Sequence, residues 1–381
     1  MSKLYLTQKV TNIFNEKFNN QPTKIVLAPG RINIVGEHTD YNKGLSMPSA
    51  IDKWVASAIS YNNKSSLDVF SINLNKMCSF NENSESNQVW AKLILSVFHF
   101  IQKKFNIKIS ANIVVGGNIP IGCGLSSSTA FTISITQAIL NLYKLNLNKK
   151  ELAVFCHKIE NAALNMGSGL LDQYAIIMSQ VNKSLIIDFL SNSFDYCSIN
   201  IPSCSWVIIN SRVNRSLSKT KYMERVRECN RALDIIKDSY KIENLRQVSF
   251  DMLKVLKNNR NLFNRVHHFI SENKRVELMK NEFLNGKKKN IGSILKDSHE
   301  SLKNKYEVSC QEIDYIIKES TKIIGWYGGR IVGGGFGGCV INFIESKYVN
   351  SYIEIIGSNY FEKYENKIEM IPIKFLGGLQ K

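Results

Sequence analysis

A glycine-rich segment between a predicted strand and a predicted helix is the feature that most constrains the fold of this 381-residue chain. Residues 110–115 have the pattern of a short strand, and residues 131–143 have that of a helix. Between them the chain reads Gly116-Gly117-Asn118-Ile119-Pro120-Ile121-Gly122-Cys123-Gly124-Leu125-Ser126-Ser127-Ser128. A glycine-rich turn that opens a helix directs unpaired backbone N–H groups and the positive end of the helix dipole at one place. The segment therefore predicts an anion site, usually one for phosphate.

The three serines that end this segment, Ser126, Ser127 and Ser128, have two interpretations. Serine is an ordinary residue at a helix N-cap, but a single cap residue satisfies the helix end. Three serines behind three spaced glycines therefore favour hydroxyl contacts with a phosphate or with magnesium. The segment is not a Walker loop, because no lysine follows a G-x-x-x-x-G pattern.

A second glycine-rich segment fits the pattern G-x-G-x-x-G at Gly333, Gly335 and Gly338. The residues after it, 339–344, have the pattern of a strand, whereas a dinucleotide site needs a helix there. We therefore predict a loop between two strands. Its glycines permit close approach of the backbone to a ligand or to the phosphate loop.

A polar segment lies nearer the start of the chain, at residues 28–44. It places an arginine, two carboxylates, a histidine and a tyrosine between glycines, with too few apolar residues to form a core element. Carboxylates accept hydrogen bonds from hydroxyl groups, histidine can donate or accept, and arginine stabilises developing negative charge. Such a segment suits a polar ligand with several hydroxyl groups.

Strands and helices are mixed along the chain rather than strictly alternating, which predicts an α+β architecture. Pro202 and the turn residues around Asn200 indicate a domain boundary near residue 200. Residues 221–320 have helical patterning, with breaks predicted near Gly286 and Gly292. Further helices are predicted at 1–18, 90–105 and 149–165, and further strands at 53–60, 206–210, 330–344 and 367–375.

The formal net charge of +17 invites a nucleic-acid interpretation. The lysines are scattered along the chain, however, and residues 287–289 form the only short cluster. Nucleic-acid binders usually gather charge on one face in a recognisable module, and no such module is present in the sequence. We therefore expect no nucleic-acid partner, and interpret the basic balance as compositional and as useful for attracting anions such as nucleotides.

The eight cysteines form no C-x-x-C pair, and no histidine cluster has zinc-ligand spacing. They are expected to be reduced and mostly buried.

Residues 1–18 lack the continuous apolar core of a signal peptide, and residues 93–101 are too few to span a bilayer. We expect no membrane partner and a soluble, cytoplasmic protein. The sequence is silent on oligomeric state, and we take a monomer as the expectation.

Three segments together resemble the motifs of the GHMP small-molecule kinases, at residues 31–41, 120–128 and 333–339. The G-E-H-x-D-Y pattern in the first is similar to galactokinases rather than to mevalonate or homoserine kinases. A fourth pair of segments, 298–302 and 306–310, resembles a galactokinase stretch in the second domain. The resemblance implies two domains with the active site between them: an N-terminal mixed-sheet α/β domain, 1–200, and a C-terminal ferredoxin-like α+β domain, 201–381.

The resemblance also implies an activity, the ATP- and magnesium-dependent phosphorylation of the anomeric hydroxyl of D-galactose to give galactose 1-phosphate and ADP. By position it assigns the catalytic roles to Asp172 and Arg31. It assigns the sugar contacts to Glu37, His38, Asp40, Gly169 and Tyr222. The ATP contacts would come from Gly122, Gly124, Leu125, Ser126, Ser127, Ser128 and Trp90, and the magnesium ligands from Ser128 and Glu160.

Several alternatives stay open on the residues alone. A carboxylate beside Arg31 is a weaker base, so Asp172 is either a general base or an electrostatic anchor for the sugar hydroxyl. Trp90, at helical spacing, is either a core residue or an adenine contact. N-acetylgalactosamine and arabinose are alternative sugars, and a catalytically inactive sugar-and-ATP sensor is an alternative function. Thr129 stands where the family usually has alanine, and Asn165 where glycine is usual.

Overall fold

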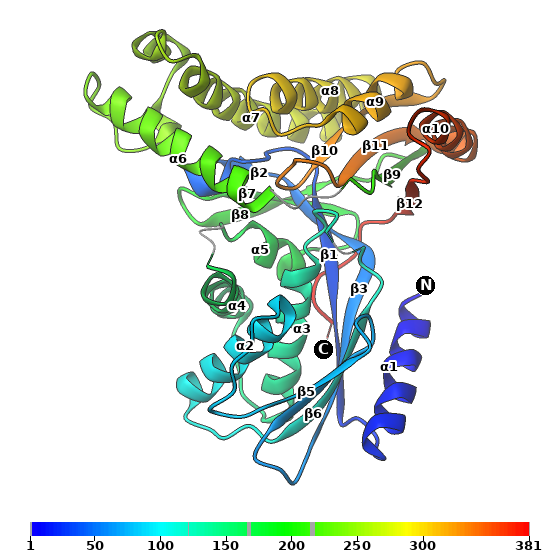
Figure 1. Ribbon diagram of the computed structural model, residues 1–381. Helices are drawn as coiled ribbons and strands as arrows, with labels where there is room; N and C mark the ends of the chain where they lie inside the picture. The colour runs from blue at the N-terminus through cyan, green and yellow to red at the C-terminus, as the bar shows by residue number, and fades with distance from the viewer. Residues whose placement is uncertain (1, 121, 166–168, 214–217, 381) are drawn as a thin grey trace.

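A computed structural model describes residues 2–120, 122–165, 169–213 and 218–380 (Figure 1). The helices are α1 (Lys3–Phe18), α2 (Val89–Phe105), α3 (Ser127–Leu142), α4 (Lys149–Leu164), α5 (Leu171–Met178), α6 (Ser218–Lys237), α7 (Arg260–Asn285), α8 (Lys288–Asn304), α9 (Gln311–Ser320) and α10 (Val349–Tyr364). The strands are β1 (Lys24–Asn33), β2 (Leu45–Ser46), β3 (Pro48–Tyr61), β4 (Leu67–Ser71), β5 (Lys76–Phe80), β6 (Ala111–Gly117), β7 (Lys183–Asp188), β8 (Ser193–Ser198), β9 (Cys204–Asn210), β10 (Trp326–Val332), β11 (Cys339–Glu345) and β12 (Glu369–Ile373).

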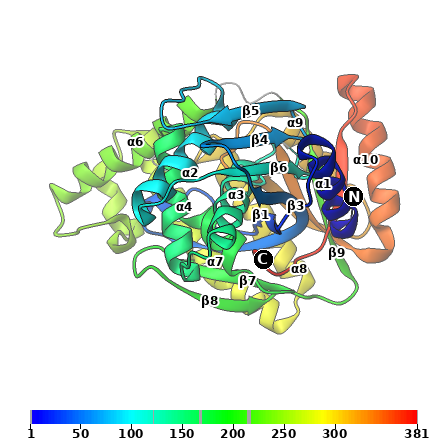
Figure 2. The same cartoon turned by 90° about the horizontal axis from the view of Figure 1, so that it is seen from below.

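The first half of the chain is built on a five-stranded sheet with the order β1-β3-β6-β4-β5. The pair β4–β6 is parallel and the other pairs are antiparallel, so the sheet is mixed as predicted. Helices α2 to α5 cover one face, and α1 covers the other (Figures 1 and 2). Leu6, Val10 and Phe14 of α1 recur every fourth residue and bury against that second face.

The second half contains a four-stranded antiparallel sheet with the order β10-β11-β9-β12. Helices α6 to α9 connect β9 to β10, and α10 connects β11 to β12. This connectivity, with the first and third strands of the sheet in its centre, is the ferredoxin-like arrangement. The prediction of an α+β fold with two different sheets is confirmed.

Two features join the halves. A three-stranded sheet, β2-β7-β8, lies beside α7, and residues after β12 return to the first sheet. There Gln380 forms a bridge with Leu27, and Phe375 forms one with Ile51. The last residues of the chain therefore pack on the sheet of the first half. The proposed division at residue 200 stays a prediction.

The helical region between β9 and β10 has more breaks than the sequence predicted, because α6 ends at Lys237, α7 begins at Arg260, and residues 305–310 separate α8 from α9. A break occurs at Gly286, which ends α7 with a left-handed backbone (φ 65°). The break predicted near Gly292 is wrong, because α8 continues through this residue. Gly292 is instead a contact point, since a side chain there would collide with the backbone of Tyr327 in β10. Within the described ranges, no helix combines the length and apolar character that crossing a bilayer requires.

Candidate active site

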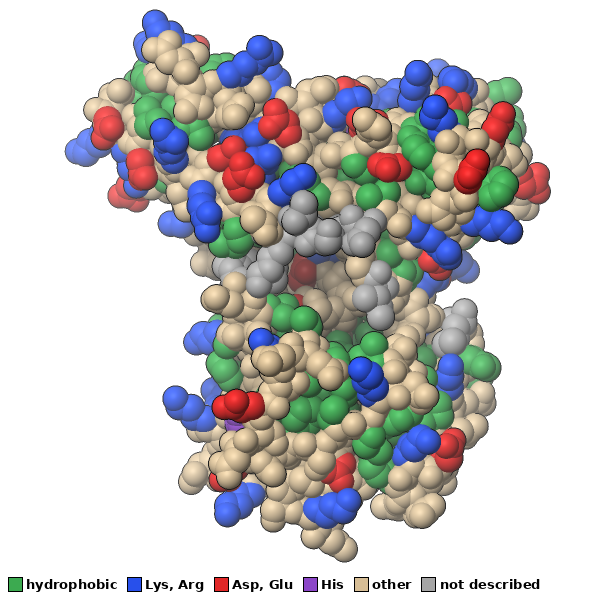
Figure 3. All heavy atoms as spheres, viewed as in Figure 1, with side chains coloured by type: hydrophobic (Ala, Val, Ile, Leu, Met, Phe, Trp, Pro, Cys, Tyr) green, Lys and Arg blue, Asp and Glu red, His purple; other side chains and the backbone are tan. Residues whose placement is uncertain are grey.

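A pocket of about 480 Å³ lies between the two halves, within the range of small-molecule sites. Figure 3 shows the molecule hollowed between its lower and upper parts, where the pocket lies. All but one of the predicted site residues line it, although they come from segments far apart in the sequence. They are Arg31, Glu37, His38, Asp40, Gly122, Gly124, Leu125, Ser126, Ser127, Ser128, Glu160, Gly169, Asp172 and Tyr222.

Trp90 is the exception, because it lies on α2 outside the described lining of this pocket. Its ring packs partly buried against the core of the first half, and its indole N–H donates to Oε1 of Gln88 at 2.9 Å. The packing of the ring fits the core interpretation. The adenine contact stays a prediction.

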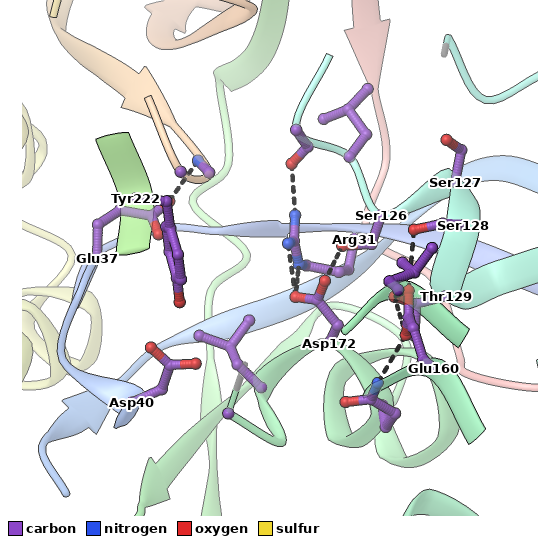
Figure 4. Close-up of a pocket in the computed structure, with 18 of the residues that line it drawn as sticks. Arg31, Glu37, Asp40, Ser126, Ser127, Ser128, Thr129, Glu160, Asp172 and Tyr222 are labelled. Atoms are coloured by element: carbon purple, nitrogen blue, oxygen red, sulfur yellow. Dashed lines mark hydrogen bonds and ion pairs between the residues drawn. The ribbon is translucent and has the colours of Figure 1, made fainter. Parts of the chain in front are cut away.

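Asp172 lies in the first turn of α5 and joins two other segments. Its Oδ1 accepts from Nε of Arg31 at 2.6 Å and lies 2.5 Å from Nη2, while its Oδ2 accepts from the hydroxyl of Ser126 (Figure 4). Arg31 also donates from Nη1 to the carbonyl of Gly124 at 2.5 Å. A charged guanidinium and a hydroxyl therefore fix the orientation of the carboxylate at the pocket wall.

Figure 4 shows Asp172 between two groups of side chains. Glu37, Asp40 and Tyr222 lie on one side of it. Ser128 and Glu160 lie on the other. The pocket therefore has an acidic and aromatic part and a hydroxyl-rich part, with the carboxylate of Asp172 between them.

The hydroxyl-rich part is centred on Glu160 of α4, which is 7% exposed. Its carboxylate accepts from Ser128 Oγ at 2.9 Å, from Thr129 Oγ1 at 2.9 and 3.0 Å, and from Gln173 Nε2 at 2.9 Å. Burial, and then the nearby charge of Asp172, raise the pKa of Glu160 to about 7.

A carboxylate and a hydroxyl beside a phosphate site suit Mg²⁺, which takes few protein ligands and keeps waters and phosphate oxygens. In the described part of the chain, no group of three or more His, Cys, Asp or Glu residues could hold a metal.

The phosphate loop has the expected left-handed turns. Gly122 and Gly124 have φ of 76° and 74°, and Ser126, at the N-cap of α3, has φ of 57°. The side chain of Ser126 makes no capping hydrogen bond to the helix, and its hydroxyl donates to Asp172 instead. The second glycine-rich loop approaches this one, since a Cβ at Gly333 would lie 3.0 Å from Cα of Gly124. The predicted approach of the two loops is confirmed.

In the acidic part, Glu37 joins the polar segment to the second glycine-rich loop. Its Oε1 accepts from Nη2 of Arg330 at 2.8 Å and from the N–H of Gly333 at 2.7 Å. Asp40 lies against Gly169, where any side chain would collide with the Asp40 carboxylate. Burial, followed by repulsion from Asp172, raises the pKa of Asp40 to about 7.

His38 and Tyr222 form the aromatic wall of this part. Their ring centroids are 5.4 Å apart, and Tyr222 lies at the same distance from Tyr41. Burial, and then the neighbouring His268, lower the pKa of His38 to about 3, so the imidazole is neutral at physiological pH. Its Nδ1 lies 2.9 Å from the hydroxyl of Tyr41, so the neutral ring can offer Nε2 to a sugar hydroxyl.

Two residues that hold the polar segment were not found by sequence reasoning. Glu272 on α7 accepts from the backbone N–H groups of Gly36 and Glu37, at 2.9 and 3.3 Å. Arg330 in β10 is fully buried and donates to the carbonyls of Asn33 and Ile34. Arg330 could have been suspected, because a charged residue in an apolar strand needs a buried partner. Glu272 gives no such signal within a polar helix.

Comparison with known proteins agrees with this geometry. The galactokinase galactose-binding signature matches residues 12–61, the GHMP kinases N terminal domain matches residues 92–180, and the GHMP kinases C terminal model matches residues 279–357. Fold and family models together therefore define the class, the GHMP kinases.

Individual relatives show which family of GHMP kinases the chain belongs to. The galactokinase of Thermosipho africanus is 35% identical over 357 residues, covering 93% of this chain and 99% of the relative. A galactokinase of Clostridium perfringens is 31% identical over 360 residues, covering 91% and 92%. The crystal structure of Lactococcus lactis galactokinase complexed with galactose has a TM-score of 0.92 at 27% identity, covering 99% of this chain and 100% of that one. The chain belongs to the galactokinase family.

A mevalonate kinase structure, that of Methanococcus jannaschii, has a TM-score of 0.67 at 20% identity and covers 93% of this chain. At this identity the likeness concerns the fold alone. The motif-based preference for galactokinases over mevalonate kinases is confirmed by the relatives at 31–35% identity.

Proposed function

We propose that this protein transfers the γ-phosphoryl group of ATP to the C1 hydroxyl of D-galactose. The observation that carries the proposal is the position of Asp172. Its carboxylate, held by Arg31 and Ser126, lies between a part suited to sugar hydroxyls and a part suited to phosphate and metal. Phosphoryl transfer needs an aligned acceptor and stabilised charge more than covalent catalysis, and this arrangement supplies both.

The phosphate loop and the start of α3 would receive the triphosphate. Ser127 and Ser128, the first two residues of α3, line the pocket there, and the N-terminus of a helix attracts anions. Mg²⁺, when bound, would neutralise charge on the β- and γ-phosphates. Ser128 and Glu160 are the residues we propose to hold it, and the hydrogen bonds from Thr129 and Gln173 keep the Glu160 carboxylate oriented toward Ser128.

The sugar would lie against Glu37, His38, Asp40 and Tyr222, with its C1 hydroxyl at Asp172. Gly169 leaves the room that Asp40 needs in this wall. The acceptor and donor groups of these side chains match a ligand with several hydroxyls. Because Asp172 already accepts from Arg31 and Ser126, we propose that it mainly orients the C1 hydroxyl and takes the proton late in a loose transition state.

Purified protein with Mg-ATP and D-galactose tests the proposal through ADP release, with glucose, N-acetylgalactosamine and arabinose alongside. Asp172→Asn should lower kcat by about 10²–10⁴-fold. Asp68→Asn is the matched control, because Asp68 is also a hydrogen-bonded carboxylate but lies on β4 away from the pocket. Turnover with another sugar alone would move the substrate. Galactose and ATP binding without any turnover would favour the sensor.

We further propose that the enzyme acts in the cytoplasm as a monomer. All eight cysteines are free thiols, as a reducing compartment requires. Cell fractionation and light scattering of the purified protein test these two points directly.

A further inference from the structure

Tyr306 is fully buried behind the acidic and aromatic part of the pocket, where we place the sugar. It follows α8 in the chain and does not belong to the described lining of the pocket. Its ring lies between two imidazoles, with centroid distances of 4.8 Å to His38 and 4.5 Å to His268. Because His38 lines the pocket, Tyr306 can support one wall of the site from behind.

The Tyr306 hydroxyl lies in a chain of hydrogen bonds that ends at His38. It lies 2.8 Å from the hydroxyl of Tyr41, which in turn lies 2.9 Å from Nδ1 of His38. On its other side, the thiol of Cys229 in α6 lies 3.1 Å away. Tyr306 therefore contacts the His38 ring directly with its own ring and indirectly through Tyr41.

The protonation states make this chain an orienting device. His38 is neutral, and burial raises the pKa of Tyr41 and Tyr306 well above their usual range, so neither phenol ionises. Each hydroxyl in such a chain donates one hydrogen bond and accepts another. If Tyr306 donates to Tyr41, then Tyr41 donates to Nδ1 of His38, and the ring proton stays on Nε2.

We propose that Tyr306 is a positioning residue of the sugar site, which sets the orientation and the protonated nitrogen of the His38 imidazole. This inference rests on the proposed function, because it assigns His38 to the sugar. Removal of the Tyr306 hydroxyl leaves Tyr41 free to turn, and His38 then loses its fixed donor to the sugar. The triphosphate part of the pocket contains neither tyrosine and keeps its contacts.

The test is Tyr306→Phe, with Tyr352→Phe as matched control. Tyr352 is equally buried and also has one hydroxyl partner, Ser320 at 2.8 Å, but belongs to the core of the second half. We expect Tyr306→Phe to raise the KM for galactose about fivefold, as for loss of one neutral hydrogen bond. The KM for ATP and kcat should change less than about twofold in both variants.

A double-mutant cycle separates positioning from packing. If Tyr306 acts through Tyr41, the variant with both Tyr41→Phe and Tyr306→Phe should have the same galactose KM as Tyr41→Phe alone. Additive effects would contradict the chain. An unchanged galactose KM in Tyr306→Phe, with a loss of melting temperature equal to that of Tyr352→Phe, would overturn the proposal. Absence of turnover in the wild type would instead contradict the proposed function, and galactose affinity by calorimetry would then replace KM.

Discussion

Asp40 illustrates at the scale of one residue how a site for a polar ligand opposes folding. Its carboxylate is partly buried beside Asp172, and desolvation and the Asp172 charge raise its pKa from 3.8 to about 7. A carboxyl group whose pKa is raised by folding binds its proton more tightly in the folded state, so its ionisation destabilises the fold as pH rises from 3.8 to above 7. The residue therefore suits a ligand at this position better than it suits the fold.

Asp40→Asn should therefore stabilise the protein while it impairs the enzyme. We expect the free energy of unfolding to rise by about 1–3 kcal/mol at pH 8, with a smaller gain at pH 5. Galactose turnover should fall at both pH values. Urea denaturation at the two pH values, beside ADP release, measures both effects. A variant that is less stable than the wild type at pH 8 would contradict the burial of an ionised Asp40.

The family resemblance assigned residues from separate segments to one site, and their roles there stay predictions. Arg31, Asp40 and Asp172 lie together in the pocket, as expected from their segments. Thr129 was noted only as a departure from the family, yet its hydroxyl contacts both oxygens of Glu160. A side chain's partner depends on the packing of α3 against α4, which no local pattern encodes.

At the scale of elements, α8 shows why a glycine inside a helical pattern is ambiguous. Apolar periodicity predicted helices in this region, and Gly286 does end one of them. Gly292, however, lies where α8 packs against β10, so that a Cβ would collide with the backbone of Tyr327. Glycine as a helix end and glycine as a contact point look alike in sequence, because the difference lies in the neighbouring strand.

A pair of glycine variants tests this interpretation. Gly→Ala inside a helix ordinarily stabilises by about 0.5–1 kcal/mol. We expect that gain for Gly357→Ala in α10, where only the terminal methyl of Met370 is near. Gly292→Ala should instead destabilise the protein by about 1–3 kcal/mol, because the strand must shift. Denaturation midpoints of the two variants give the comparison, and a stabilised Gly292→Ala would show that α8 does not touch β10 closely.

In the whole molecule, the second half of the chain fixes the polar segment, residues 28–44, of the first half. Glu272 of α7 accepts from Gly36, Glu37 and the hydroxyl of Ser298, and Arg330 of β10 pairs with Glu37. Burial opposes the charge of Glu272, but Arg275, His268, Arg330 and the N–H of Gly36 outweigh it and lower its pKa to about 2. The family resemblance predicted that the two halves meet at the site. The contacts of Glu272 with Gly36 and Glu37 could not be predicted, because these partners lie more than 200 residues away in the sequence.

Glu272→Gln should weaken this connection in a pH-dependent way. A lowered pKa contributes stability that is present above pH 4.5, the unfolded value, and is lost as pH falls toward 2. We expect a loss of about 2–3 kcal/mol at pH 7 and at pH 5, and a smaller one at pH 3.5. Glu277→Gln, an exposed position on the same helix, is the control. A difference that grows on acidification would reverse the sign and contradict the account.

The proposed function requires the pocket to direct phosphate to one hydroxyl of one sugar. The most direct measurement is NMR of the product formed from Mg-ATP and D-galactose, with phosphorus–proton coupling used to locate the new ester. We expect a phosphate on C1, and almost no product from Asp172→Asn in the same time. A phosphate on another carbon would contradict the placement of the C1 hydroxyl at Asp172, and release of inorganic phosphate alone would contradict transfer to the sugar.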